Sequence, residues 1–140
     1  MSMKKSFSLL CPCGSNRAYS ECCKIYHEGA LPPNALALMK SRYSAYFFHL
    51  PDYIIKTTHP DNPLFQKDSK KWREDILSFC KGTLLKKLEI LETDLQNEES
   101  FVTFKVHFEQ NKKTAFFIEK SRFLKIKDQW LYREGVILGY

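Results

Sequence analysis

Four of the five cysteines in this chain of 140 residues lie within one short stretch near its start, CPCGSNRAYSECC. One residue separates the first two cysteines, eight residues separate the two pairs, and the last two cysteines are adjacent. Four thiolates around one ion form the closed, tetrahedral kind of zinc site that stabilises a fold and leaves no position for a substrate. The spacing therefore predicts one structural zinc ion held by Cys11, Cys13, Cys22 and Cys23.

Two other uses of clustered cysteines fit this spacing less well. A thioredoxin-type redox site needs two cysteines with two residues between them, and that spacing is absent from the sequence. An iron–sulfur cluster can also take four cysteines, but its usual runs contain neither an adjacent pair nor a one-residue spacing. His27 follows closely and is a fallback ligand, although we expect it to lie at the surface or beside the site.

The residues between the cysteines favour a tight and irregular backbone. Pro12, Gly14 and Ser15 are typical of a turn, and Asn16 tolerates the left-handed conformation better than most residues do. A regular helix or strand would turn two adjacent cysteines apart. We therefore expect the second pair to lie on irregular backbone or at the start of a helix.

Composition and charge place the cysteines in a small folded protein. Hydrophobic residues make up 44% of the chain and aromatic residues 14%, which excludes a disordered chain and allows one sizeable core. The net charge of +6 permits an acidic partner such as nucleic acid. No apolar run reaches the length of a membrane span, and the first ten residues lack the apolar region of a signal peptide. We expect a cytoplasmic protein without membrane contact, where reduced cysteines bind metal.

Helical periodicity begins after the two prolines that end the cysteine-rich segment. Asn34 is a good N-cap residue, and apolar side chains recur at helical spacing over residues 35–50. Pro51 interrupts this pattern, and Asp52 can cap one or two further turns. These elements place a long helix directly after the cysteines.

A further helix should run from a cap at Ser69 to Gly82, and strands should follow it. Phe104, Val106 and Phe108 alternate with polar residues, which is the pattern of a half-buried strand. The expected strands cover residues 83–95, 101–110, 114–127 and 130–138, with turns at 111–112 and 127–129. Helices followed by antiparallel strands predict an α+β fold. Cys80 is expected to be a buried, unreactive thiol.

The cysteine stretch resembles the SEC-C motif, named for the metal-binding tail of the SecA translocation ATPase and typically written CPCGSGxxYxxCC. Asn16 stands where the motif usually has glycine. The following LALMKSRYSAYFFHLPDYIIKTTHP resembles the YchJ family of bacterial proteins, and the resemblance extends over nearly the whole chain. It implies a SEC-C zinc knot at residues 1–31 and a nuclear transport factor 2-like (NTF2-like, cystatin-like) domain at residues 32–140. In that fold a curved antiparallel sheet wraps around the N-terminal helices as a cone.

A second candidate site is a pocket between the long helix and the sheet. Arg42, Tyr43, Tyr46 and His59 could together bind an anion or an aromatic ring, and a histidine could act as an acid or base. The simpler interpretation is that the tyrosines belong to the core and that His59 is a loop residue. In that interpretation Arg42 bonds backbone carbonyls or a carboxylate such as Asp52.

Three functions follow, in order of preference. The first is a zinc-binding interaction or adaptor protein, because the SEC-C resemblance implies a protein partner at the knot. The second is a small-molecule binder or enzyme that uses the cone pocket. We assign no catalytic residue, because the sequence contains no nucleophile motif and no phosphate-binding loop. We therefore favour a protein without enzymatic activity. The third is ribosome or RNA association through basic strands, where Lys125 and Lys127 share a face with Phe123. The oligomeric state does not follow from the sequence.

Overall fold

The computed structural model describes residues 9–140, so the basic lead with Lys4 and Lys5 lies outside the described part. Its helical elements are η1 (Tyr19–Glu21), α2 (Cys23–His27), α3 (Ala35–Phe47), α4 (Pro51–Lys56) and α5 (Ser69–Gly82). They are followed by strands β1 (Leu84–Leu95), β2 (Glu99–Gln110), β3 (Lys113–Ile126) and β4 (Gln129–Gly139). The four strands form one antiparallel sheet in sequence order, which confirms the predicted α+β fold.

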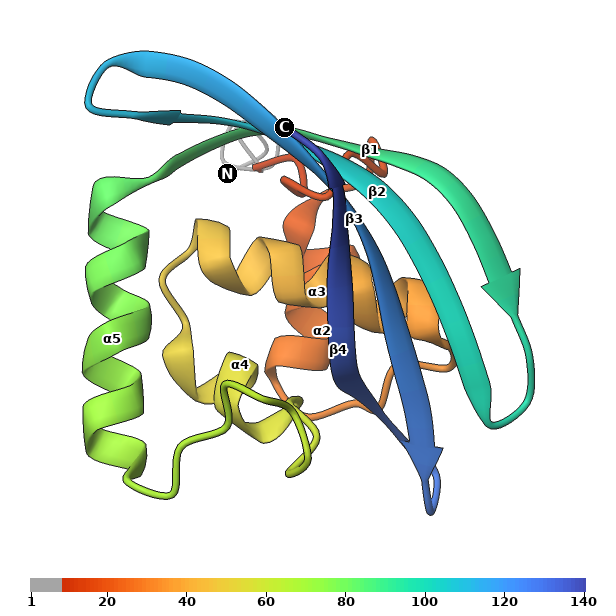
Figure 1. Cartoon of the computed structure of the whole chain (residues 1–140). Helices are drawn as coiled ribbons and strands as arrows, with labels where there is room; N and C mark the ends of the chain where they lie inside the picture. Colours follow the sequence, from red (N-terminus) through yellow and green to blue (C-terminus); the bar gives the residue numbers. More distant parts are fainter. Residues whose placement is uncertain (1–8) are drawn as a thin grey trace, which may run out of the picture.

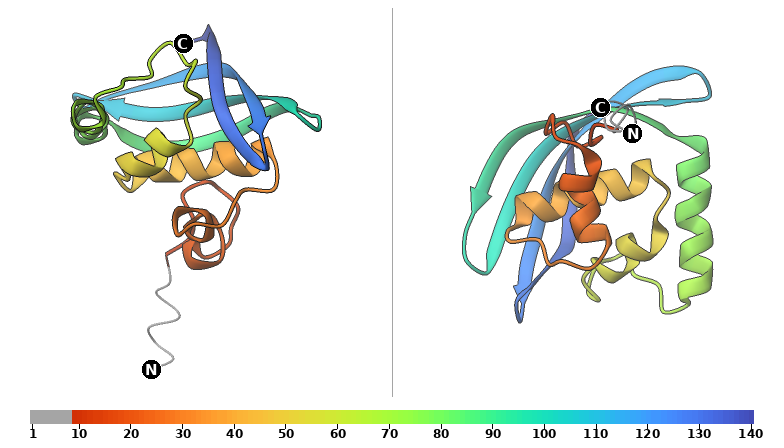
Figure 2. Two further views of the ribbon diagram at one scale, coloured as in Figure 1. Left: turned by 90° about the horizontal axis from the view of Figure 1, so that it is seen from below. Right: turned by 180° about the vertical axis from the view of Figure 1, so that it is seen from behind.

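The sheet is curved, and α3 lies in its concave face (Figure 1). Seen from below, the molecule has the sheet on one side of α3 and the cysteine-rich knot on the other (Figure 2). Irregularities in the register of β1 with β2 and of β3 with β4 add local bends to the strands. This arrangement is the cone that the family resemblance implied.

The long helix begins where the sequence predicted and ends earlier. The Asn34 side chain accepts a hydrogen bond from the Ala37 amide, which confirms it as the N-cap residue. The helix ends at Phe47 rather than at residue 50, and α4 then starts at Pro51, where a proline suits the first helical turn. Asp52 lies inside that first turn and makes no cap. Its carboxylate instead pairs with Arg73 of α5 at 2.8 Å.

The cap of α5 is Asp68 rather than the predicted Ser69. The Asp68 carboxylate accepts hydrogen bonds from the amides of Lys70 and Lys71, each at 3.1 Å. Two adjacent residues could both cap this helix, and the carboxylate also interacts favourably with the helix dipole. The helix ends at Gly82, as expected.

Two-residue turns connect β2 with β3 and β3 with β4, whereas residues 96–98 connect β1 with β2. Asn111 and Lys112 both have positive φ, 51° and 64°, as the favoured type of tight hairpin requires. On the concave face of β2, Phe104 and Val106 are buried and Phe108 is partly buried, so the predicted alternation is confirmed. Within residues 9–140 no helix has the length and apolar character needed to cross a membrane.

The apolar core has two parts. One lies between α3 and the sheet and contains Leu38, Met39, Val102, Phe123 and Trp130, among others. The other joins α3, α4 and α5 and is built from Ala45, Tyr53, Ile54, Trp72, Ile76 and Cys80. Cys80 is a free, buried thiol whose pKa is raised by burial, which agrees with the predicted unreactive role.

Candidate metal centre

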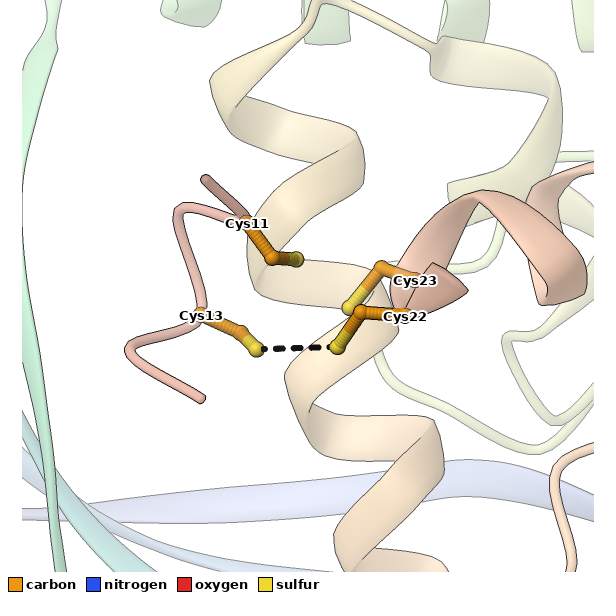
Figure 3. A group of neighbouring side chains, drawn as sticks. All are labelled: Cys11, Cys13, Cys22 and Cys23. Atoms are coloured by element: carbon orange, nitrogen blue, oxygen red, sulfur yellow. Dashed lines mark hydrogen bonds between the residues drawn. The ribbon is translucent and has the colours of Figure 1, made fainter. Parts of the chain in front are cut away.

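The four clustered cysteines point their sulfur atoms at one another (Figure 3). All four Sγ atoms lie within 4.8 Å of each other, and every one of these residues is at most 6% exposed. Four sulfurs at about 2.3 Å from a central ion would be about 3.8 Å apart in an ideal tetrahedron. The Sγ atoms of Cys13 and Cys22 are 3.6 Å apart. The donor set and its spacing fit a tetrahedral metal ion.

Local sequence explains how these sulfurs converge. The loop that carries Cys11 and Cys13 is closed by the Cys11 amide, which donates to the Arg17 carbonyl at 2.8 Å. Gly14 and Asn16 have positive φ, 87° and 65°, so both predicted turn residues are used. Cys22 lies between η1 and α2 with non-helical dihedrals, and Cys23 is the first residue of α2. The adjacent pair thus lies at an irregular helix start, as expected.

Polar groups surround the sulfur cluster. The Ser15 hydroxyl lies 3.2 Å from the Cys22 sulfur, and the Ser44 hydroxyl of α3 lies 3.5 Å from the Cys11 sulfur. Cys22 also raises the pKa of the exposed Arg17. Hydroxyl donors and a guanidinium near sulfur stabilise thiolates, which are the form that binds a metal.

The acid–base balance of the cluster also suits a cation. A hydrogen bond from the Cys23 thiol lowers the pKa of Cys13 to about 4, while the same contact and burial raise the pKa of Cys23. Two buried thiolates this close repel each other, so without a cation the cluster disfavours ionising both of them. A divalent cation can take the place of the thiol proton and allow all four sulfurs to be ionised.

His27, the predicted fallback ligand, uses both ring nitrogens elsewhere. Its Nε2 lies 2.8 Å from the Ser41 carbonyl oxygen, and its Nδ1 lies 2.6 Å from the Tyr19 hydroxyl. A carbonyl only accepts, so Nε2 carries the proton and Nδ1 accepts from the tyrosine. Burial lowers the pKa of His27, which keeps the ring neutral. It therefore acts as a bridge between the knot and α3.

Further contacts hold the knot against the helices. The Tyr19 ring lies 4.4 Å from the ring of Phe48, and the His27 ring lies 4.8 Å from that of Tyr53. The knot is thus packed on α3 and α4, on the side away from the sheet (Figure 2). The division into a knot at residues 1–31 and a domain at residues 32–140 stays a prediction.

The predicted pocket residues separate into two groups. Arg42, Tyr43 and Tyr46 line a cavity of about 170 Å³ between α3, α5 and the sheet. His59 is not among its lining residues. The amide of His59 donates to the Tyr132 carbonyl at 2.8 Å, and its Nδ1 accepts from the Asp61 amide. The backbone hydrogen bond holds the loop after α4 against β4. The His59 ring forms its hydrogen bond within that loop.

Arg42 is buried and fixed by several partners. Its Nη1 donates to the Ile54 carbonyl at 3.1 Å and to the hydroxyls of Thr57 and Thr58 at 2.8 and 3.1 Å. Its guanidinium lies 4.7 Å from the centre of the Tyr132 ring. Bonding to a carbonyl agrees with the simpler expectation for this residue, whereas the suggested pairing with Asp52 is not found.

Sequence reasoning missed three polar residues of the same cavity. Glu119, Ser121 and Tyr132 line it from β3 and β4, and the Tyr132 hydroxyl donates to Glu119 at 2.8 Å. Glu119 and Ser121 alternate with outward-facing residues on the strand that places Phe123 in the core. A charged residue on the inward face of a strand was the signal that could have revealed this group.

Two further residues of the sheet, Phe123 and His107, bear on the expected uses of its surface. Phe123 is 1% exposed, so it cannot stack on a nucleic-acid base beside Lys125 and Lys127. His107 lies partly exposed on β2 and pairs with Glu89 of β1, and this hydrogen bond lowers the pKa of Glu89. Spacing along the chain could not reveal a pair that strand register brings together.

Comparison with known proteins agrees with this architecture. The cysteine knot and the helix-filled cone define a SEC-C protein of NTF2-like fold: residues 8–24 match the SEC-C motif, and residues 34–135 match the family described as "YchJ, middle NTF2-like domain". A UPF0225 protein of Enterobacter sp. (strain 638) is 39% identical over 129 residues, which cover 90% of this chain and 82% of the relative. The chain belongs to the YchJ family, and the family resemblance is confirmed.

Two solved structures share the fold over most of the chain. A SEC-C motif containing protein from Rhodopseudomonas palustris superposes with a TM-score of 0.80 and 27% identity, covering 91% of this chain and 98% of that one. One from Psychrobacter arcticus has a TM-score of 0.75 and 28% identity, covering 91% and 82%.

Proposed function

We propose that this protein is a zinc-stabilised adaptor whose cysteine knot binds another protein. The convergence of four buried sulfurs on one point is the observation that carries this proposal. Zinc is the ion of choice because a set of four thiolates forms its usual structural site. Cys11, Cys13, Cys22 and Cys23 are the proposed ligands. The closed set gives the ion no open position, so its role is to hold the knot in shape.

The surface of the knot supports a role in binding. Large apolar side chains are exposed on or beside the knot, namely Leu9, Leu10, Ile25 and Leu31. Exposed apolar residues near a rigid element are typical of interaction surfaces when they gather in one region. Glu21 and Glu28 balance Arg17 and Lys24, so the exposed apolar side chains rather than net charge favour a partner with an apolar segment. We also propose the cytoplasm as its compartment, because cysteines that bind metal must stay reduced.

A photo-crosslinking amino acid placed at Ile25 tests this proposal in cells. The matched control carries the same group at Leu91, which is exposed on β1 of the sheet. We expect a discrete protein adduct from position 25 that is absent from position 91 and is lost when Cys13→Ser is introduced. The proposal would be wrong if the knot gave no protein adduct or if the adduct did not depend on Cys13. Nuclease-sensitive adducts would instead favour the RNA hypothesis. In that case binding of RNA by the purified protein should weaken steeply as the salt concentration rises.

A further inference from the structure

The cavity on the other face of α3 takes none of its lining residues from the knot. It measures about 170 Å³, and most of its lining is apolar. An apolar cavity of about 150 Å³ holds one benzene molecule, so this one has room for a single aromatic ring or a branched alkyl group of that size. Phe79 of α5 contributes to its lining and is 45% exposed, so the cavity reaches the surface beside this residue.

Two charged residues, Arg42 and Glu119, are among those that line the cavity. The guanidinium of Arg42 is occupied by three protein oxygens and by the Tyr132 ring. The three oxygens all contact Nη1, so the hydrogens of this nitrogen are used within the protein. Glu119 is the other charged residue of the cavity, and its carboxylate is the candidate for contact with a cationic ligand.

The Glu119 carboxylate is held in place by its neighbours. The hydroxyls of Ser121 and Tyr132 both donate to Oε2, and within residues 9–140 the hydrogen bonds to this carboxylate all use that oxygen. Burial, followed by the proximity of Glu119, raises the pKa of Tyr132, so this hydroxyl remains a donor at neutral pH. Oε1 thus remains as an acceptor for a hydrogen-bond donor in the cavity.

A glycine of the neighbouring strand makes room for this carboxylate. A Cβ on Gly135 would lie 2.6 Å from the Tyr132 hydroxyl and closer still to Oε2 of Glu119. Such distances are too short for atoms that are not bonded, so any larger residue at position 135 would displace the carboxylate. The position of Glu119 therefore depends on three groups from β3 and β4.

We propose that this cavity binds a small aromatic or branched apolar molecule that carries an amino group, with Glu119 as the acceptor of that group. The apolar walls take the body of the ligand, and the carboxylate takes its ammonium hydrogens. A charged donor paired with a carboxylate in a mostly apolar site gives a stronger hydrogen bond than a neutral donor does. The same contact disfavours a carboxylate ligand, because two negative charges would meet.

Three probes of similar shape and different charge test this proposal: benzylamine, benzyl alcohol and benzoate. Binding is followed by nitrogen–proton NMR titration of the full chain. We expect benzylamine to bind most tightly and to shift the amides of Ser121 and Tyr132. Benzoate should bind at least tenfold more weakly, since a hydrogen bond to a charged group changes affinity by about this factor. Tighter binding of benzoate, or no shift with any probe, would overturn the proposal.

Variants identify the group that recognises the amine. Glu119→Gln keeps the shape and can still accept from Ser121 and Tyr132, and it should lower benzylamine affinity about tenfold while benzyl alcohol binding stays the same. Gly135→Ala should have a similar effect by displacing the carboxylate. Glu92→Gln, at an exposed position on β1, is the matched control and should change nothing. Equal benzylamine affinity in Glu119→Gln and the unaltered protein would also overturn the proposal.

Discussion

The two faces of α3 support two regions of different construction. Ser41 and Ser44 face the knot, where they contact His27 and Cys11. Arg42 and the tyrosines of the same helix face the cavity. The knot obtains its four sulfurs from thirteen consecutive residues, whereas the cavity is assembled from helices and strands far apart in the sequence.

The two regions also differ in what holds them in shape. The charged residues of the cavity have partners within the protein, since Arg42 donates to Thr57 and Thr58 and Glu119 accepts from Tyr132. The sulfur cluster can be fully ionised only with a cation among the thiolates. We therefore expect the knot to respond to metal and the cavity to respond to changes in its own side chains.

The largest effect should come from Cys13→Ser. Loss of one ligand should remove the metal and speed amide hydrogen exchange in residues 9–31, while β2 and β3 keep their slow exchange because they have their own core. Hydrogen exchange with mass spectrometry measures both regions in one experiment. Cys80→Ser changes the fifth cysteine and should leave exchange in the knot unaltered. Global unfolding of Cys13→Ser would break the comparison, since the knot would then be integral to the cone.

Arg42→Met should have the next largest effect, on the stability of the whole domain. It removes three hydrogen bonds from a charged donor in a buried position, and we expect a loss of about 2–3 kcal/mol in the free energy of unfolding. Urea denaturation measures this loss. Lys40→Met, on the same helix in a less buried position, should change stability by about 0.5 kcal/mol or less. Equal stability of the two variants would contradict the structural role of Arg42.

Asp68→Ala should have a smaller effect, limited to the wall that α5 forms. Loss of the cap should cost about 1 kcal/mol, because two amides at the helix start lose their acceptor. Ser69→Ala is the control at the position that the sequence favoured and should cost little. Thermal unfolding of both variants distinguishes the two residues, and a larger loss in Ser69→Ala would reverse the assignment of the cap.

The smallest effect concerns the bridge between the knot and α3. Burial lowers the pKa of His27, so the unfolded chain binds a proton more readily than the folded protein. Stability should therefore fall as the pH drops below about 6.5, the ordinary histidine pKa, and through the lower pKa of the folded state. His27→Gln should flatten this part of the pH profile, measured by urea denaturation. His49→Asn, at an exposed residue, should keep the original slope, and identical slopes in all three proteins would contradict this role.

The knot could be predicted from sequence because its ligands and its turn residues are local. Gly14 and Asn16 allow the left-handed backbone that the loop uses, and the start of α2 accommodates the adjacent cysteines. The strands were equally clear, because Phe104 and Val106 alternate with polar residues. The pattern of residues along the chain predicts the structure wherever that structure is determined by residues close together in the sequence.

The cavity could be predicted only in part, because the pairing of strands and the packing of α3 on them determine which polar groups meet there. Arg42 was identified from its place on the helix, but its partners are in α4 and the segment that follows it. His59 was assigned to the pocket, yet the bridge between Thr58 and Tyr132 holds that loop to β4. Glu119 required knowledge of the face on which each residue of β3 lies.

Native mass spectrometry of the protein, purified without added metal, tests the central claim most directly. We expect one zinc ion per chain, with a mass that corresponds to four deprotonated cysteines, and no zinc in Cys13→Ser. An intact fold that carries no metal would contradict it. So would iron with inorganic sulfide, or a Cys13→Ser protein that keeps its full zinc content.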